Sequence, residues 1–401
     1  MSSLNVALVH AYAWPEVRRG GERLVDDLTR YLRGRGHRVD AYCGTKAESR
    51  FFTGPGGRNY LFHVPSVRAL ERGGLGHIET FGARAVVPLL LHRYDVVHAF
   101  TPTAALASIA AGQPTIYTVI GHPTASSLPR HRFQRSALAR AVRLSTEVAV
   151  LSRSAQRALE DAFGRRAVIL PPGVGTSGFD PDLQPRSGPP CVLFSGDMGN
   201  PDKGLDVLVA AFEQVLHKHP DARLQLSGPG TTGRVERSAA ASWERIRSAV
   251  DVLGTGAVEE IPDRYRSAHV TVLPSRDEAF GIVLVESLAC GTPVIGGEPG
   301  GAEDIVDPSV GRLVPHGDVY GLAVAIDECI RMATEEGTAA RCDEHARRWD
   351  WAAIGTQYEA VYTSVAGRRG LPGLALLGSR FRRDARGGPS AERPNPASRS
   401  G

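Results

Sequence analysis

Residues 273–286 read LPSRDEAFGIVLVE, and residues 287–306 continue as SLACGTPVIGGEPGGAEDIV. The run of apolar and β-branched residues at 270–273 predicts a strand, 280–289 has the spacing of a helix, and 293–295 predicts another strand. A strand, a helix and a second strand in this order form the repeating unit of a parallel α/β sheet. This segment therefore indicates an α/β fold.

The loop of this unit presents Glu278, and the helix is expected to open at Phe280 and Gly281, followed by Ile282. Free N–H groups and the positive end of the helix dipole favour an anion at such an N-terminus, and a glycine lets a phosphate approach closely. Glu286 lies two turns into the helix, where its carboxylate can accept two hydrogen bonds from a diol such as a ribose. Taken alone, the spacing also fits an ordinary strand-helix unit with two solvated glutamates.

The same alternation occurs on both sides of a proline-rich segment at 180–190, which we interpret as a linker. Before it, strands are expected at 5–10, 37–42, 95–100, 115–120, 147–152 and 167–170. After it, strands are expected at 191–195, 223–226, 270–273 and 293–295, and helices at 205–216, 280–289 and 319–332. The pattern predicts two Rossmann-like, doubly wound domains that face a central crevice, with ligands at the carboxyl ends of the strands.

We assign residues 1–180 to the first domain and 181–348 to the second. Residues 349–366 are expected to form an amphipathic helix that packs back on the first domain. Residues 367–401 are rich in arginine, glycine, proline and serine without an apolar period, and we expect this basic tail to be disordered.

The composition excludes several classes of protein. The five cysteines are odd in number, scattered and never in a C-x-x-C pair, so neither a disulfide framework nor a zinc site is indicated. No apolar run approaches the ~20 residues that cross a bilayer, and no leader pattern opens the chain, so we expect a cytoplasmic protein. With 47 basic and 43 acidic residues, the net charge of +4 argues against a nucleic-acid binder.

Glu278 and Glu286 form an E-x7-E element that resembles the retaining glycosyltransferases of family 4, which have the two-domain GT-B fold. The resemblance covers about residues 4–365. Further matching pieces are Gly20-Gly21-Glu22-Arg23-Leu24, residues 32–39, Pro171-Pro172-Gly173-Val174, Asp202-Lys203-Gly204-Leu205-Asp206 and Asp350-Trp351. Each piece is weak alone, but their order and spacing are specific and favour a binding site over solvated glutamates.

The resemblance implies roles for particular residues. Glu278 would contact the hydroxyls of the donor sugar, Glu286 would bind the ribose, and the final helix would cross back to the first domain. His122, between Gly121 and Pro123, lies near the position of a histidine that lines the sugar site in relatives, and a structural role is the alternative. The expected donor-binding residues are Gly20, Gly21, Gly196, Lys203, Phe280, Gly281, Ile282 and Glu286.

Lys203 is informative because the chain has three lysines among 47 basic residues. A lysine at the start of a helix can meet a departing diphosphate with a point charge. Asp197, by contrast, departs from the family, in which an arginine commonly follows the glycine at the Gly196 position. A charge pair at ~4 Å is worth about 4 kcal/mol at an effective dielectric of 20, so an acid that faces a diphosphate would repel it strongly.

Asp197 therefore points away, or the phosphates sit differently, or Asp197 contacts an amino or hydroxyl group. Arg23, Arg264 or Arg276 are candidates for the missing cation. The sequence contains no convincing metal site: the D-x-D at 180–182 lies in the linker. The G-x-G-x-x-G at 228–233 does not open its domain and is a weak match.

Residues 130–143, RHRFQRSALARAVR, hold five arginines without an acid, with Phe133, Ala137 and Leu138 as an apolar stripe. This segment allows weak peripheral membrane contact, or contact with an anionic acceptor.

Together these features predict a retaining transferase that moves a hexose from a UDP- or GDP-sugar to a hydroxyl acceptor, a small natural product or a glycolipid precursor. The sugar nucleotide is a co-substrate, and no cofactor or metal is expected. No residue stands out as a covalent nucleophile. This favours a front-face mechanism, in which the acceptor attacks from the side on which the diphosphate leaves and the leaving phosphate assists the acceptor. The alternatives are a phosphorylase of the same fold, with Lys46 or Lys218 as a Schiff-base candidate, and an inactive sugar-nucleotide binder, which Asp197 would explain.

Overall fold

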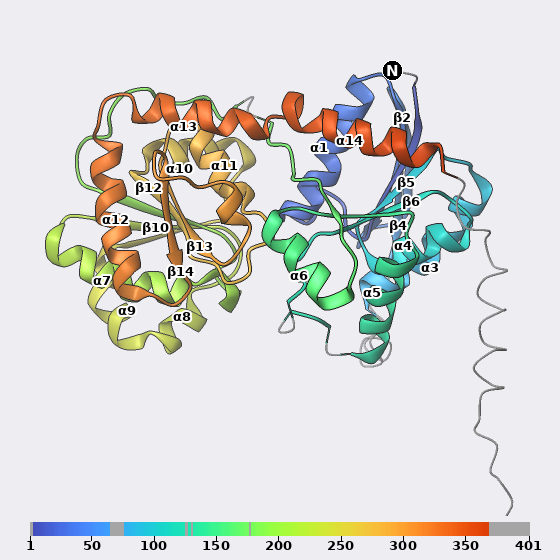
Figure 1. Cartoon of the computed structure of the whole chain (residues 1–401). Coiled ribbons are helices and arrows are strands. Elements are labelled where there is room, and N and C mark those ends of the chain that lie inside the picture. Colours follow the sequence, from blue (N-terminus) through green and yellow to red (C-terminus); the bar gives the residue numbers. More distant parts are fainter. Residues whose placement is uncertain (1–2, 65–75, 125–126, 130, 176–177, 369–401) are drawn as a thin grey trace, which may run out of the picture.

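The computed structural model describes residues 3–64, 76–124, 127–129, 131–175 and 178–368. Two α/β domains lie side by side, and the chain crosses between them twice, through the linker after β8 and through the last helix (Figure 1). One sheet has eight strands and the other has six, which confirms the predicted fold class.

The sheet of the first domain has the strand order β3-β4-β2-β1-β5-β6-β7-β8, in which the β3–β4 pair is antiparallel and the other pairs are parallel. Its strands are β1 (Asn5–His10), β2 (Arg38–Thr45), β3 (Arg50–Gly54), β4 (Gly57–His63), β5 (Val96–Ala99), β6 (Thr115–Val119), β7 (Glu147–Val150) and β8 (Val168–Ile169). Its helices are α1 (Gly20–Gly34), α3 (His77–Leu91), α4 (Pro102–Ala110), α5 (Arg132–Leu144) and α6 (Arg153–Phe163).

Both faces of this sheet are buried, as expected for a mainly parallel sheet. Val6 and Leu8 of β1 pack in one apolar cluster with Leu24 and Leu28 of α1. Residues of β1 on the opposite face pack in a second cluster with α3, α4 and α5. The carboxyl ends of β1 and β6, which carry the candidate site, are thereby fixed from both sides.

The second sheet is parallel throughout, with the order β11-β10-β9-β12-β13-β14. Its strands are β9 (Cys191–Ser195), β10 (Arg223–Ser227), β11 (Val250–Gly254), β12 (Val270–Leu273), β13 (Val294–Glu298) and β14 (Gly311–Pro315). The helices are α7 (Leu205–Lys218), α8 (Gly233–Ser238), α9 (Ala240–Ile246), α10 (Ile261–Ser267), α11 (Ile282–Ala289), α12 (Val319–Ala333) and α13 (Thr338–Ala346), with short 3-10 turns that include η1 (Pro201–Lys203) and η4 (Gly301–Asp304).

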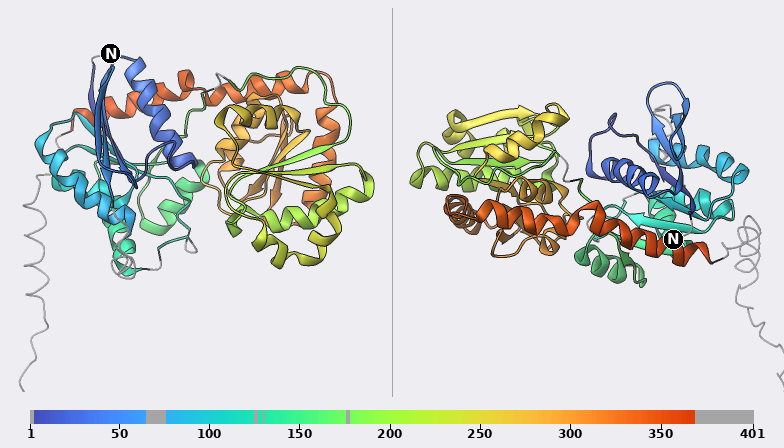
Figure 2. Two further views of the ribbon diagram at one scale, coloured as in Figure 1. Left: turned by 180° about the vertical axis from the view of Figure 1, so that it is seen from behind. Right: turned by 90° about the horizontal axis from the view of Figure 1, so that it is seen from above.

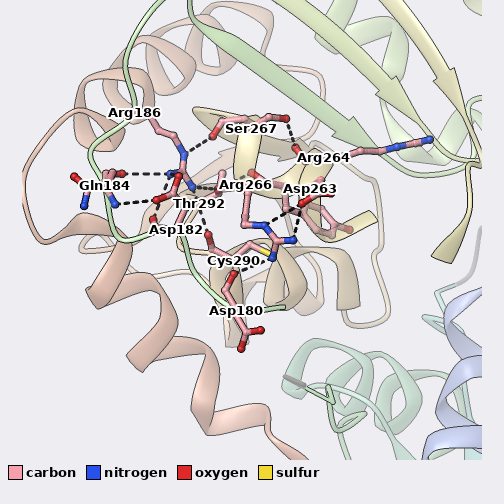
Figure 3. A network of polar contacts seen from close by, with 12 residues as sticks. Asp180, Asp182, Gln184, Arg186, Asp263, Arg264, Arg266, Ser267, Cys290 and Thr292 are labelled. Atoms are coloured by element: carbon pink, nitrogen blue, oxygen red, sulfur yellow. Dashed lines mark hydrogen bonds and ion pairs between the residues drawn. The ribbon is translucent and has the colours of Figure 1, made fainter. Parts of the chain in front are cut away.

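Residues 178–190 of the linker contain neither helix nor strand. Arg186 ties this segment to the second domain: its Nε donates to Ala268 O at 3.1 Å, and its Nη2 donates to Thr292 Oγ1 at 3.1 Å (Figure 3). Arg266 holds the start of the linker by donating to Asp180 O at 3.0 Å. In this first crossing, bending between the domains is therefore expected before residue 180.

Helix α14 (Trp351–Ala366) follows α13 and lies along the first domain (Figures 1 and 2). Tyr358 donates from its hydroxyl to Leu170 O at 3.1 Å, and Glu359 accepts from Arg35 Nε at 3.0 Å. The ring of Trp351 fills the space over Gly173, where a Cβ would lie 2.4 Å from the indole.

Several predicted boundaries shift because a polar residue caps the helix. The last helix begins at Trp351 rather than 349, since Asp350 accepts a hydrogen bond from Ala352 N at 2.7 Å. The predicted strand at 147–152 ends at Val150, because Ser152 caps α6 by accepting from Ala155 N. The antiparallel hairpin of β3 and β4 was not predicted.

All five cysteines are free thiols. In the ranges that the structure covers, no helix combines the length and the apolarity needed to span a bilayer. Of the predicted tail at 367–401, the structure describes residues 367 and 368, and the rest lies outside the described residues.

Candidate functional site

Lys203 and Glu278 form an ion pair at the carboxyl edge of the second sheet. Lys203 Nζ donates to Glu278 Oε2 at 2.7 Å. Lys203 ends η1, and Gly204 follows with a φ of 69°. Gly204 lies so close to the loop after β12 that a Cβ at this position would be 2.3 Å from Pro274 O. Burial opposes ionisation of Glu278, but the charge of the Lys203 ammonium and the hydrogen bonds to the carboxylate together outweigh it, so the pKa of the Glu278 carboxyl is lowered.

The N-terminus of α11 lies next to this pair. The helix begins at Ile282 and not at Phe280, because Gly281 adopts φ 97° and Phe280 is buried. Gly301 N donates to Glu278 O at 2.7 Å, and a Cβ on Gly301 would lie 2.4 Å from Phe280 Cα. The glycine-rich turn after β13 thus holds the loop. Leu284 N donates to Gly281 O at 2.9 Å, and the N–H groups of Ile282 and Val283 lie before it at the helix N-terminus, where an anion is favoured.

Gly20 and Gly21 begin α1 in the first domain and lie opposite α11. A Cβ on Gly20 would lie 3.8 Å from Ile282 Cγ2, and a Cβ on Gly21 would lie 3.2 Å from the side chain of Ile120. Two helix N-termini from different domains therefore meet, and their dipoles both favour a negatively charged ligand between them.

Glu286 is 3% exposed, and both of its oxygens have partners. Tyr265 donates its hydroxyl to Oε2 at 2.8 Å, and Arg23 of the first domain donates to Oε1. The charge of Glu286 is the largest influence on Arg23 and raises the pKa of its guanidinium. Glu286, the residue predicted to bind the ribose, is thus held in an ion pair between the domains.

His122 is 7% exposed and lies in the loop after β6. Its Nε2 is 2.9 Å from Ser154 Oγ, and its Nδ1 is 3.8 Å from Asp277 Oδ1 in the second domain. Burial lowers the pKa of His122, although the charge of Asp277 opposes this. The structure brings His122 to the loop that carries Glu278, across the domain interface.

Gly196 and Asp197 follow β9 at the same sheet edge. The Asp197 carboxylate accepts a hydrogen bond from Gly199 N at 2.9 Å, and a Cβ on Gly230 would lie 2.7 Å from Asp197 Oδ1. Asp197 therefore closes a turn, and its carboxylate lies against Gly199 and Gly230.

The three arginines weighed as replacement cations differ in their contacts. Arg23 is paired with Glu286 as described above, and Arg264 donates to Ser227 Oγ at 2.8 Å and to Gly254 O at 2.7 Å. Arg276 is exposed, and its Nη2 lies 3.2 Å from His316 Nε2. The Arg276 guanidinium pairs with no carboxylate among the described ion pairs, so it is the least committed of the three candidates. Its backbone N donates to Asp202 O at 2.7 Å, which places it beside Lys203.

Three residues in this site were missed by the sequence analysis: Asp277, Tyr265 and Ser154. Asp277 adjoins Glu278, but nothing in the sequence indicates that it contacts His122. Tyr265 belongs to α10, which no prediction covered. Among the described residues, no group of three or more His, Cys, Asp and Glu side chains has the arrangement to hold a metal ion.

The basic segment at 130–143 corresponds to α5, apart from Arg130, which lies outside the described residues, and His131, which is the N-cap residue. Its predicted apolar stripe is wrong in part: Ala137 and Leu138 are buried against the domain, and only Phe133 is exposed, at 46%. The outward face is therefore cationic, formed by Arg132, Arg135, Arg140 and Arg143.

Two family models match the chain. Residues 18–177 match the family model described as Glycosyltransferase Family 4, and residues 179–349 match the one described as Glycosyl transferases group 1. A phosphatidyl-myo-inositol mannosyltransferase of Mycolicibacterium smegmatis is 30% identical over 289 residues, 68% of this chain and 72% of the relative.

A GDP-mannose-dependent alpha-(1-6)-phosphatidylinositol monomannoside mannosyltransferase of the same species is 30% identical over 286 residues, 66% of this chain and 73% of the relative. Among solved structures, a sucrose-phosphate synthase of Thermosynechococcus elongatus has a TM-score of 0.73 at 21% identity, covering 90% of this chain and 99% of that one.

Proposed function

The chain belongs to glycosyltransferase family 4 and is a retaining, nucleotide-sugar-dependent hexosyltransferase, and we propose that it moves mannose from GDP-mannose to an inositol-containing glycolipid precursor. The choice of donor and acceptor is supported by the names of the two mannosyltransferases to which the chain is similar. The observation that carries the proposal is the meeting of the Lys203–Glu278 pair with two helix N-termini at the domain interface.

Each group of the site has a part in this reaction. The N–H groups of α11 and the Lys203 ammonium would neutralise the leaving diphosphate, which is the charge that develops in the transition state. Glu278 would bind hydroxyls of the transferred sugar, and Glu286 would bind the ribose once Arg23 releases it. The acceptor oxygen bonds to the anomeric carbon on the face that the diphosphate leaves, and its proton passes to the leaving phosphate oxygen.

The alternative of a pyridoxal-phosphate-dependent phosphorylase gains no support. Lys218 is 65% exposed and pairs with Asp327 at 3.3 Å, while Lys46 is exposed. A Schiff-base lysine needs a desolvated pocket that lowers its pKa. Neither lysine has such a setting.

A lipid-linked acceptor requires contact with a membrane surface, and the cationic face of α5 suits anionic head groups. A juxtamembrane basic side chain is worth about 1 kcal/mol near such a surface. We expect binding to vesicles that contain phosphatidylinositol, and its loss when Arg132, Arg135, Arg140 and Arg143 are replaced by glutamine. The matched control replaces Arg234, Arg237, Arg245 and Arg247 of the second domain.

The test is transfer from a panel of GDP- and UDP-hexoses to phosphatidylinositol in vesicles and to free inositol phosphate, with products identified by mass spectrometry. GDP-mannose and the lipid acceptor are expected to give the largest kcat/KM, with retention at the anomeric carbon. A faster reaction with another nucleotide sugar, or with the soluble acceptor alone, contradicts the proposed substrates.

We also expect transfer without a divalent metal, because Lys203 and the helix N–H groups fill the electrostatic role of one. Dialysis against excess EDTA should leave the rate unchanged. Loss of activity that Mg²⁺ or Mn²⁺ restores would contradict this and would direct attention to Asp197 as a ligand.

A further inference from the structure

A cavity of about 520 Å³ lies at the amino edge of the first sheet, between the turn that precedes β2 and the β3–β4 hairpin. This amino-edge cavity is lined by two arginines, Arg38 and Arg58, together with Ser3, His37, Thr53 and three glycines. No acidic side chain is among the described residues of its wall. Its volume is in the usual range of small-molecule sites, and its charge favours an anion.

The cavity is separate from the candidate donor site. Arg38 pairs with Asn5 at the start of β1, whereas His10 ends β1 beside Gly21, whose Cβ would lie 3.7 Å from His10 Nε2. The strand from Asn5 to His10 spans about 17 Å, at about 3.3 Å per residue. A small ligand in the cavity therefore leaves the donor site free.

Arg38 and Arg58 lie on the same face of the sheet. Arg58 Nη1 donates to the Tyr60 hydroxyl at 3.2 Å, and the Tyr60 ring stacks on Tyr42 with the ring centroids 4.5 Å apart. Tyr42 and Arg38 share a face of β2, because side chains alternate along a strand. Thr53 pairs with Arg58 in the hairpin and so lies on this face as well. Two guanidinium groups and a hydroxyl can thus meet one ligand.

Two buried acids near the cavity have partners of their own. Asp40 accepts from Arg58 N at 2.9 Å and from the Tyr94 hydroxyl at 2.9 Å. Glu359 lies 3.3 Å from His37 Nε2. The guanidinium groups of the two arginines pair with no carboxylate among the described ion pairs, so their charge is available to a ligand.

The backbone beneath the cavity is held in place before any ligand binds. Val39 N donates to Gly56 O at 2.8 Å, and a Cβ on Gly57 would lie 1.8 Å from Val39 O. Arg33 Nη2 donates to Val39 O at 2.8 Å and to Arg58 O at 3.1 Å. Because β2 and the hairpin are already fixed, binding pays little for ordering them.

We propose that the amino-edge cavity binds a phosphate ester, with Arg38 and Arg58 holding the phosphate group and the Thr53 hydroxyl donating to it. Guanidinium groups match a phosphate, whose oxygens accept several charge-assisted hydrogen bonds at once. A cavity of this volume also has space for the rest of a small ester. This site is independent of the proposed function.

Protein labelled with ¹⁵N-glycine tests the proposal, because Gly36, Gly56 and Gly57 line the cavity whereas Gly20 and Gly281 belong to the donor site. Amide spectra are recorded while inorganic phosphate, and separately glycerol 3-phosphate, is added at constant ionic strength. We expect the three cavity glycines to shift and to saturate with one common Kd for each probe. Cavity glycines that do not shift, or that shift without saturation, overturn the proposal.

Arg38→Gln and Arg58→Gln should each raise this Kd about tenfold, since each removes a charge-assisted hydrogen bond. The matched control is Arg50→Gln in the same hairpin, because Arg50 pairs with Glu16 at 3.2 Å and is not among the described residues of the cavity. The control should leave Kd within about twofold. Unchanged amide shifts of Gly20 and Gly281 in the free variants show that they are folded. An equal loss in all three variants would assign the effect to net charge and overturn the proposal.

Flotation with phosphatidylcholine vesicles, with and without phosphatidic acid, separates the two sources of a phosphate ester. It compares the wild type with the Arg38→Gln/Arg58→Gln double variant. Binding to phosphatidic acid that the double variant loses assigns the site to a lipid head group. Binding that is equal in both proteins, or absent from both, assigns it to a soluble ester, provided that the cavity glycines saturate as expected.

Discussion

The ammonium group of Lys203 acts on two charges, the Glu278 carboxylate at 2.7 Å and the diphosphate expected at α11. Lys203→Met should lower kcat by about 10²-fold or more, the scale of losing one preorganised donor to a developing charge. It also removes the charge that lowers the pKa of Glu278, so burial then raises that pKa. Protonation of Glu278 on lowering the pH should therefore begin at a higher pH than in the wild type.

The measurement is the pH profile of kcat for both proteins. Lys218→Met is the matched control, because Lys218 pairs with Asp327 on the surface and should leave kcat within about twofold. An unchanged kcat and an unmoved acid limb in Lys203→Met would remove Lys203 from the proposed site.

The two glutamates of the E-x7-E element should differ in what they bind. Glu286→Gln is expected to weaken binding of GDP about tenfold, since a carboxylate that accepts from a ribose diol loses a charge-assisted hydrogen bond. Glu278→Gln should keep that affinity and lose turnover, since its ligand is the sugar. Calorimetry with GDP and steady-state kinetics separate the two effects. Equal loss of GDP affinity in both variants would refute this division.

At the scale of elements, the first turn of α14 packs on the chain that leaves the first domain. A Cβ on Gly173 would lie 2.4 Å from the Trp351 ring, and the ring is itself buried. Gly173→Ala should therefore destabilise the protein by about 1–3 kcal/mol, the usual cost of overpacking. Gly175→Ala is the control, because among the described residues other than its chain neighbours no atom lies within 4 Å of its added Cβ. Urea denaturation of both variants gives the comparison, and equal midpoints would show that the indole moves aside freely.

The strands were predictable where apolar runs are bounded by turns. The predicted bounds of β1, β9 and β12 agree with the structure. The hairpin of β3 and β4 was missed because β3 is an exposed edge strand, with Phe51 and Phe52 more than half exposed, and carries no buried alternation. Caps, not hydrophobic periodicity, fix the first residues of α11 and α14.

The site was predictable only in pieces. The E-x7-E spacing singled out Glu278 and Glu286 and indicated the family. The two family matches confirm the family, and the roles of the two glutamates stay predictions. The contact of Asp277 with His122 joins residues from two domains, so it depends on how the domains close, which no local pattern encodes. The same holds for the pairing of Arg23 with Glu286.

At the scale of the whole molecule, the two domains are held together in the arrangement that the structure shows. One apolar cluster extends from β1 and α1 through α14 to α11. Two ion pairs join α6 to η4: Arg153 with Asp304 at 2.6 Å and Arg157 with Glu303 at 2.8 Å. Both arginines are mostly exposed, so salt screens these pairs and each contributes little. The buried pair of Arg23 and Glu286 is the stronger electrostatic link.

This pair has a consequence for donor binding. If Glu286 binds the ribose, the ribose hydroxyls must displace Arg23, and a hydrogen bond to a charged group contributes about 1.5–3 kcal/mol. Arg23→Met should therefore bind GDP about tenfold more tightly than the wild type, and the free protein should be more open, with a larger radius of gyration in X-ray scattering.

Asp27, the other partner of Arg23, keeps its pair with Arg30 at 3.0 Å. The control is Arg30→Met on the same helix, where the exposed arginine makes only contacts with Asp26 and Asp27 among the described ion pairs, and GDP affinity should not change. Weaker binding of GDP by Arg23→Met would contradict this. It would mean that the Arg23 guanidinium contacts the nucleotide and replaces the arginine that relatives carry at the position of Asp197.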